Sequence, residues 1–319
     1  MSFVDLAPRQ LRSSFLAHPS AGLIAALLTV VGWTTWVIGT RYAMASGALQ
    51  IDPAGLAVIR FGVAAVLLAP VWLRIGLIPR GLDHRSLFGL LFAGAPFVAF
   101  VSAGLALAPA AESAPIVTGL MPVVTGALAA AFLGQRLGRL QVSGLLVILA
   151  GIAVIVAGGL MRNPAAWQGY AFFLAGALAW GVYSVSFRKS GLGAIEATAL
   201  IAVWSFIAVL PWGAGSLLHA AETSSVGVLA GQVIIQGCVA GVFSIVAFSF
   251  ASTRLGPAKA SALTAMTPVC VLVAATVLLG EHFTVPVILG SLIVGCGVVA
   301  ASGSLPLALA RRLPALVRG

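Results

Sequence analysis

Arg60 is the only strong base deep within a predicted membrane span, and this makes it the first candidate for chemistry in the sequence. A charge inside a span normally faces protein or water and marks function. Its guanidinium could hold a substrate carboxylate in a planar, bidentate arrangement. It could instead anchor helix ends or extend its charge toward the membrane surface. The sequence alone leaves both interpretations of Arg60 open.

Aromatic side chains recur on the predicted helices and could line a path for a small-molecule substrate. Trp33 and Trp36 align with Trp180 and Tyr183 at a shift of 147 residues. Trp and Tyr also mark membrane interfaces, and Phe is often in plain contact with lipid. The aligned pairs are therefore better candidates for a pathway than the phenylalanines, which are Phe97, Phe100 and Phe243.

The sequence contains no motif for catalysis. It has no Walker A loop, no HExxH and no GxSxG, and its four His and seven acidic residues fall at predicted span ends or in loops. We therefore predict that the protein is not an enzyme and has no cofactor and no metal site. A membrane-embedded enzyme acting on lipids is a remote alternative. A proton pump usually carries a buried carboxylate relay, and the lack of one favours a uniporter or facilitator.

The amino-acid composition indicates that these residues lie on helices that cross a membrane. Of the 319 residues 61% are hydrophobic and 8% are charged, against about 25% charged residues in soluble domains. Charge-free stretches recur that reach the roughly 20 residues of a membrane helix, and the backbone must satisfy its own hydrogen bonds in lipid. The net charge of +10 comes from bases scattered between the spans, which excludes a nucleic-acid partner. We therefore expect an all-α protein that is embedded in the lipid bilayer.

Ten spans explain the distribution of basic residues. With the N-terminus in the cytoplasm, fourteen of the 17 Lys and Arg residues lie on inside segments and only Arg41 and Arg162 lie outside. By the positive-inside rule this predicts a multi-pass protein of the cytoplasmic membrane with both termini cytoplasmic. Between tails over 1–20 and 307–319, the predicted spans are 21–44, 53–74, 86–108, 112–133, 139–160, 167–187, 196–217, 227–252, 258–279 and 283–305.

The sequence is internally duplicated. Residues 118–151 recur as 264–297 at a shift of 146, which divides the chain into two five-span repeats over 21–160 and 161–306. Because five is odd, the second repeat enters the membrane from the opposite side. Inverted repeats of this kind surround a central cavity with the substrate site near the midplane. The repeated residues that identify the match are Thr118/Thr264, Pro122/Pro268, Gly134/Gly280, Gly144/Gly290 and Gly151/Gly297.

The duplicated prolines are predicted to lie in the middle of spans 4 and 9. Pro122 and Pro268 cannot donate to the carbonyls four residues earlier, which belong to Thr118 and Thr264. Nearby Thr hydroxyls can help to satisfy such groups. One interpretation is a pair of bent helices that offer polar backbone to a substrate in the cavity. The other is a pair of static kinks that fit neighbouring helices together.

Glycines at intervals of seven residues mark one face of spans 5 and 10. Gly144, Gly151 and Gly158 lie on span 5, and Gly290 and Gly297 lie on span 10. Seven residues are close to two helical turns, and small residues let membrane helices approach closely. We predict that these spans brace their own bundles or pair with each other, in a monomer or a weak dimer.

The duplicated pattern resembles the drug/metabolite transporter superfamily, and its EamA-type ten-span members in particular. The pattern is a proline, then Leu-Gly-Glu, then two glycines, and it stands here as Pro268, residues 279–281, Gly290 and Gly297. The first repeat departs from it at Gln135, where the family usually has Glu. Arg60 matches an Arg that is common in span 2 of the family, which implies a structural duty for it.

The resemblance implies a secondary transporter that moves small metabolites by alternating access. The chain is similar to YddG-like exporters, which implies amino acids, including aromatic ones, as substrates. Multidrug transport or transport of sugar- or nucleotide-type metabolites within the same superfamily is the alternative, although nucleotide-sugars or sugar phosphates would need paired bases on the cavity. A structural or assembly subunit is a further, remote alternative.

Overall fold

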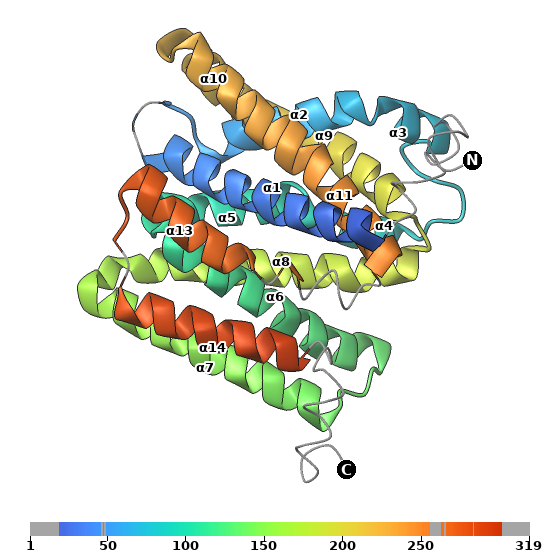
Figure 1. Ribbon diagram of the computed structural model, residues 1–319. Helices are drawn as coiled ribbons and strands as arrows, with labels where there is room; N and C mark the ends of the chain where they lie inside the picture. The colour runs from blue at the N-terminus through green and yellow to red at the C-terminus, as the bar shows by residue number, and fades with distance from the viewer. Residues whose placement is uncertain are drawn as a thin grey trace.

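The computed structural model describes residues 19–45, 47, 49–255, 263–264, 266–282 and 284–301, and the secondary structure of these residues is entirely helical (Figure 1). Every predicted span contains a described helix. Within the described residues, seven continuous helical stretches are long and apolar enough to cross a membrane, and a bent pair of helices would make an eighth. In chain order the elements are α1 (Pro19–Ala45), α2 (Pro53–Leu67), α3 (Ala69–Ile75), α4 (His84–Leu90), η3 (Leu91–Ala93), α5 (Ala95–Leu107), α6 (Ala110–Leu133), α7 (Arg139–Arg162), η4 (Pro164–Ala166), α8 (Trp167–Ser190), α9 (Ala194–Thr223), α10 (Val226–Gln232), η5 (Val233–Phe243), α11 (Ser244–Leu255), α13 (Thr267–Leu279) and α14 (Val285–Ala301).

Prolines break two of the predicted spans. The span expected over 53–74 is the pair α2 and α3, bent by 70°, with Pro70 in the first turn of α3. A proline there cannot bond to the preceding turn and its ring clashes with it. The expectation that Pro268 lies in the middle of a helix is wrong, because α13 begins at Thr267 and Pro268 lies in its first turn. Pro122 does lie inside α6.

The glycine of the Leu-Gly-Glu pattern ends a helix in both repeats. Gly134 after α6 and Gly280 after α13 adopt the left-handed conformation, with φ of +61° and +66°, which a residue with a Cβ rarely adopts. The backbone N–H groups of Gln135 and Glu281 then bond back to the carbonyls of Ala129 and Ala275 at 3.3 and 3.1 Å. This turn fixes the position of the residue after each glycine.

Helices α7 and α14 pack antiparallel through their glycine faces. A Cβ on Gly151 would lie 2.7 Å from the carbonyl oxygen of Gly290, and one on Gly297 would lie 2.7 Å from that of Gly144. The backbones therefore touch, as the glycine spacing predicts, and the two helices pair with each other inside one chain. A dimer through α7 and α14 would have to use their other faces.

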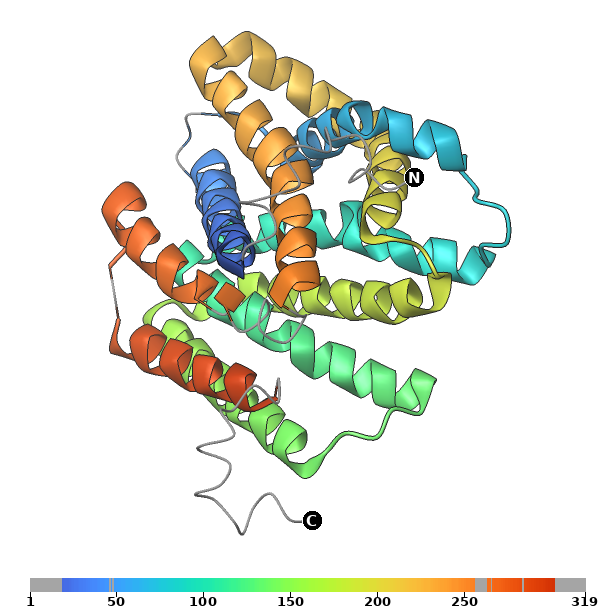
Figure 2. The same ribbon diagram turned by 45° about the vertical axis from the view of Figure 1, so that its right-hand side comes forward.

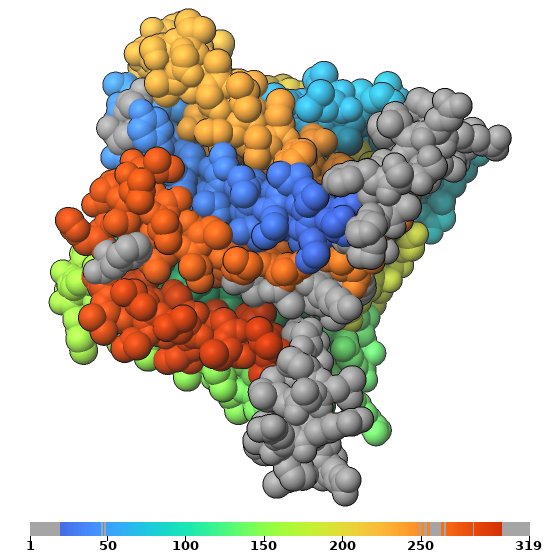
Figure 3. All heavy atoms as spheres, in the orientation of Figure 1, coloured from blue at the N-terminus to red at the C-terminus, as the bar shows by residue number. Residues whose placement is uncertain are grey.

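The helices pack into a single body. Figures 1 and 2 show α7 and α14 side by side at one edge and α2, α9 and α10 at the other, with α1, α5, α6, α8 and α13 between them. The face in Figure 3 includes α1, α10, η5, α11, α13 and α14. Several of these helices carry exposed large apolar side chains, such as Val31 of α1, Val277 of α13 and Leu292 of α14, as expected of helices that contact lipid.

Helices at equivalent positions of the two predicted repeats run in opposite directions. Gly213 of α9 lies against Ala54 of α2, and Phe206 lies against Gly62, so α2 and α9 are antiparallel. Glu281, two residues after the end of α13, accepts from the first residues of α6, so α13 and α6 are also antiparallel. At this end of α6, Arg41 near the end of α1 bonds to Glu281, and Tyr170 in the first turn of α8 bonds to Glu112, so α1 and α8 run in opposite directions as well.

Candidate functional site

Four of the predicted aromatic residues form a continuous chain of contacts through the centre of the bundle. Trp36 of α1 contacts Phe97 of α5, with ring centroids 5.9 Å apart. Phe97 contacts Trp180 of α8 at 5.3 Å, and Trp180 contacts Tyr183 at 5.1 Å. Trp180 lies near the middle of α8, Trp36 lies in the second half of α1, and Phe97 lies in the first turn of α5. Side chains from both predicted repeats therefore contact one another inside the bundle.

Arg60 extends this chain at the Trp36 end. Its guanidinium carbon lies 4.8 Å from the centroid of the Trp36 ring, a distance typical of a cation–π contact. Nη2 is 3.5 Å from the carbonyl oxygen of Ala240, at the limit of a hydrogen bond. Nη1 of Arg60 and Nε1 of Trp36 are both buried and have no hydrogen-bond partner in the described part of the chain. Two strong donors are thus held close together in the interior without an acceptor.

The segment opposite Arg60 is a π-helix, η5, over Val233–Phe243. π-helical turns are rare and frequently occur at functional sites. Gln232 immediately precedes η5 and Gln236 lies in its first turn, and both are buried. Gln236 Nε2 donates to Thr40 Oγ1 at 3.0 Å, and Gln232 Nε2 donates to the Gly39 carbonyl oxygen at 3.0 Å. This polar contact between α1 and η5 was missed from the sequence, although two glutamines four residues apart in an apolar span were a usable signal.

The other predicted aromatic residues lie away from this chain. Trp33 packs on Phe248, with ring centroids 5.7 Å apart. Phe100 stacks near Phe172 at 6.5 Å. The side chain of Phe243 is 45% exposed, as expected of a residue that contacts lipid.

The threonines that precede the two prolines make different hydrogen bonds. Thr118 Oγ1 donates to the Ala114 carbonyl oxygen at 2.7 Å, within α6. The carbonyl of Thr264 accepts a 2.7 Å hydrogen bond from Thr267 Oγ1, so a threonine hydroxyl satisfies the carbonyl that Pro268 cannot reach. The hydroxyl assistance expected from the sequence thus occurs at the second proline and comes from Thr267.

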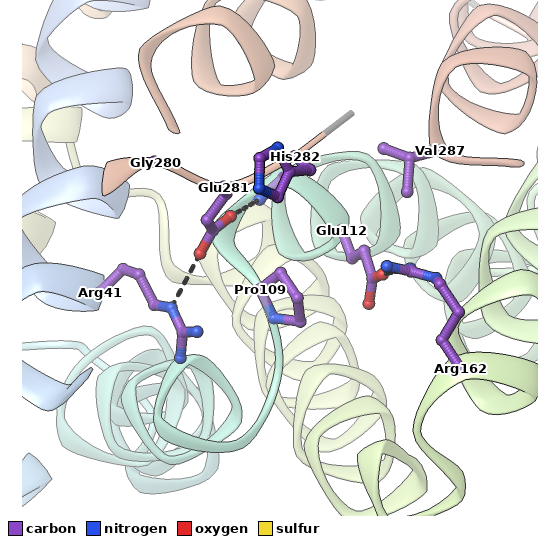
Figure 4. A pocket seen from close by; sticks show the side chains of 9 residues that line it. Arg41, Pro109, Glu112, Arg162, Gly280, Glu281, His282 and Val287 are labelled. Atoms are coloured by element: carbon purple, nitrogen blue, oxygen red, sulfur yellow. Dashed lines mark hydrogen bonds and ion pairs between the residues drawn. The ribbon is translucent and has the colours of Figure 1, made fainter. Parts of the chain in front are cut away.

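A cluster of charged residues closes one end of the bundle. Glu281 accepts from Arg41 Nε at 2.9 Å and from the backbone N–H groups of Ala110 and Ala111 at 3.1 Å each (Figure 4). It therefore caps α6, where a carboxylate is favoured by the unpaired N–H groups and the helix dipole. Arg41 Nη1 also donates to the Leu105 carbonyl oxygen at 2.7 Å. One carboxylate thus joins α1, α5, α6 and α13.

A second ion pair lies beside the first. Glu112, 2% exposed, accepts from Arg162 at the end of α7 and from Tyr170 Oη at 2.6 Å. Figure 4 shows Glu112 and Arg162 pointing toward each other on one side of a pocket and Arg41 and Glu281 on the other. The pocket has a volume of about 230 Å³ and also includes His282 in its wall. No residue of the aromatic chain lines it.

An equivalent of the Arg41–Glu281 pair lies at the opposite end of α6. Arg188 Nη1 donates to Gln135 Oε1 at 2.7 Å on the exposed surface. Arg188 aligns with Arg41 and Gln135 with Glu281 at the shifts found in the sequence. Glu281 caps the first turn of α6 and Gln135 follows its last, so the 24-residue helix separates the two pairs by about 36 Å.

Comparison with known proteins agrees with the membrane fold. Residues 20–157 and 167–303 each match the EamA-like transporter family. A "Probable terminal-alkyne amino-acid exporter" of Streptantibioticus cattleyicolor is 30% identical over 276 residues, covering 82% of this chain and 86% of the relative. The "Aromatic amino acid exporter YddG" of Ancylobacter novellus is 30% identical over 240 residues, covering 66% and 82%. A solved crystal structure described without a function is 22% identical with a TM-score of 0.55, over 92% of this chain and 99% of its own, which supports the fold alone.

Proposed function

Because the chain belongs to the EamA-like transporter family, whose members are transporters and not enzymes, we propose that it exports amino acids, including aromatic ones, by alternating access across the cell membrane. The relatives named as amino acid exporters support the substrate class, and the aromatic chain from Trp36 to Tyr183 supports the aromatic preference.

The proposal includes ten spans in two inverted repeats, over 21–160 and 161–306. Support comes from the two consecutive family matches of nearly equal length. It also comes from the opposite directions of equivalent helices, α2 with α9, α6 with α13 and α7 with α14. A two-fold axis in the membrane plane relates helices in this way.

The observation that carries alternating access is the pair of equivalent contacts at the two ends of α6. In an inverted repeat each contact belongs to one face of the membrane. One end is joined by the ionic Arg41–Glu281 pair with its two backbone hydrogen bonds. At the other end the equivalent contact is the hydrogen bond from Arg188 to the neutral amide of Gln135. Opening one end while the other is closed would expose the aromatic chain to one side at a time.

With both termini in the cytoplasm, as the basic residues favour, the Arg41–Glu281 end faces outward and the Arg188–Gln135 end faces the cytoplasm. The outer end is then the more firmly closed. A carrier held in this way opens first to the cytoplasm, where an exporter takes up its substrate.

The test is transport by the purified protein in liposomes. Vesicles loaded with unlabelled L-phenylalanine should accumulate labelled L-phenylalanine by exchange, and a panel of aromatic, aliphatic and charged amino acids should compete in that order. Empty liposomes supply the background. Exchange of none of the amino acids above that background would refute the proposal. Exchange of a nucleotide-sugar or a drug cation instead would assign the alternative substrates of the superfamily.

A further inference from the structure

Two unpaired donors in the membrane interior require an explanation. An unsatisfied buried polar group carries the full cost of its desolvation, and the cost is larger for a charged one. Arg60 Nη1 and Trp36 Nε1 are both in this condition, and the guanidinium lies 4.8 Å from the centre of the indole ring. Trp36 is 9% exposed and also contacts Phe97, the next ring of the aromatic chain. The donors are therefore part of the proposed substrate path.

We propose that Arg60 Nη1 and Trp36 Nε1 together bind the carboxylate of the transported solute. This inference rests on the proposed function and names the group by which the site recognises its substrate. A carboxylate has two acceptor oxygens and one negative charge, which match one guanidinium and one indole N–H. The aromatic rings from Phe97 to Tyr183 then contact the rest of the solute.

The charge of the site restricts the class of anion. Among the described residues Arg60 is the one guanidinium in contact with Trp36, and its Nη2 lies 3.5 Å from a backbone carbonyl oxygen, that of Ala240. A monoanion is neutralised by a single arginine, whereas a phosphate ester dianion would keep an uncompensated charge in the low dielectric of the interior. The site therefore fits monocarboxylates.

The charge also predicts a minor role for the ammonium group of an amino acid. The described acidic residues, Asp52, Asp83, Glu112, Glu196, Glu222 and Glu281, all lie at helix ends or in loops. In the described part of the chain no carboxylate reaches the aromatic chain to pair with an ammonium. The protein should therefore distinguish solutes by the carboxylate and tolerate the loss of the amino group.

The experiment compares three competitors of the same shape in the exchange assay. L-Phenylalanine, 3-phenylpropanoate, which lacks the amino group, and L-phenylalaninamide, which lacks the carboxylate, are added to the labelled phenylalanine. We expect 3-phenylpropanoate to compete within a few-fold of phenylalanine and the amide to compete at least about 10-fold more weakly, as one lost charge-assisted hydrogen bond implies. Equal competition by the amide would overturn the inference while leaving amino acid transport intact.

Two variants separate the indole donor from its ring. Trp36→Phe keeps an aromatic face over Arg60 but removes Nε1–H. The ratio of the half-inhibitory concentration of L-phenylalaninamide to that of 3-phenylpropanoate should fall several-fold, because only the acid loses a hydrogen bond. Trp212→Phe is the matched control, because Trp212 is 80% exposed on α9, and it should keep the ratio of the unaltered protein. An unchanged ratio in Trp36→Phe would exclude the indole as a carboxylate donor.

Binding is measured separately by the shift in melting temperature of the detergent-solubilised protein. A ligand that binds the folded state raises this temperature with its concentration, so 3-phenylpropanoate should raise it and the amide should not. If no amino acid is exchanged but this difference persists, the proposed transport function fails and the carboxylate site stands. If both ligands act equally, the carboxylate site fails.

Discussion

Arg188 donates to Gln135 at one end of α6 as Arg41 donates to Glu281 at the other, and the two pairs occupy equivalent positions of the duplicated sequence. Both acceptors follow a left-handed glycine and both are held by a backbone bond to a residue six positions earlier. The geometry of the contact is therefore repeated, while its charge is not. Of these two acceptors, Glu281 is charged and makes an ion pair, whereas Gln135 is neutral.

Gln135→Glu should remove this asymmetry. The new carboxylate would form an exposed ion pair with Arg188, of the kind that contributes about 0.2–1 kcal/mol. That is enough to shift an equilibrium between two open states by a few-fold. We expect a slower exchange rate at low salt and recovery at high salt, because salt screens exposed pairs. Exchange assays at 50 mM and 500 mM salt measure the effect, and a rate independent of salt would contradict it.

Glu281→Gln should weaken the opposite end. The substitution leaves Arg41 without its counter-ion and removes the charge that caps α6. Loss of a cap and of one charged hydrogen bond together implies about 2 kcal/mol. The melting temperature should fall, and a maleimide directed at a cysteine introduced at Pro109, which lines the pocket, should react faster.

The control for this variant is Glu222→Gln, which removes an exposed acid near the end of α9. It should change neither the melting temperature nor the labelling rate. Equal melting temperatures and labelling rates in the two variants would mean that the Arg41–Glu281 pair does not keep this end of the bundle closed.

The glycine contact of α7 and α14 gives a matched pair of substitutions. Gly151→Ala would place a methyl group 2.7 Å from the backbone oxygen of Gly290, so the helices must separate. Overpacking of this kind costs about 1–3 kcal/mol. Gly295→Ala lies on α14 where a methyl group meets nothing within 4 Å, and it should be neutral or stabilising because alanine favours a helix. Thermal unfolding in detergent should separate the two, and equal melting temperatures would contradict the packing.

The sequence predicted the helices and the glycine contact because both depend on local patterns. Apolar length defines a span, and glycines seven residues apart define a face. It did not predict the Arg41–Glu281 pair, because the two residues are 240 positions apart and nothing local to either one indicates the other. The duplication relates Arg41 to Arg188 and Glu281 to Gln135, and this correspondence becomes informative once one of the two contacts is seen.

The position of Pro268 was mispredicted for a different reason. A proline in an apolar stretch is compatible with a kinked helix and with a helix that begins one residue earlier, and local sequence does not distinguish them. Pro122 and Pro268 align well but have different surroundings, one inside α6 and one in the first turn of α13. Of the predicted site residues, those that contact one another in a chain are Arg60, Trp36, Phe97, Trp180 and Tyr183, whereas Trp33 packs on Phe248.

The orientation of the repeats can be tested by labelling. In a background with Cys238, Cys270 and Cys296 replaced by serine, single cysteines at Leu137 and Asn163 lie at opposite ends of α7. An impermeant maleimide added to whole cells should label the cysteine at 163 and leave that at 137 unlabelled until the membrane is disrupted. The reverse pattern would invert the proposed orientation, and labelling of both from outside would exclude a spanning α7.

The two prolines should respond differently to replacement by alanine. Pro122→Ala supplies an N–H inside α6 that can bond to the Thr118 carbonyl, so the helix gains a hydrogen bond and can straighten. We expect a higher melting temperature and a lower exchange rate, because α6 connects the two charged ends.

Pro268→Ala changes the first turn of α13, where a missing N–H costs little, and the Thr264 carbonyl already accepts from Thr267. Its melting temperature and exchange rate should stay near those of the unaltered protein. Measured side by side, an equal loss of exchange in both variants would contradict the different surroundings of the prolines. Full exchange with Pro122→Ala would mean that the bend in α6 serves packing alone.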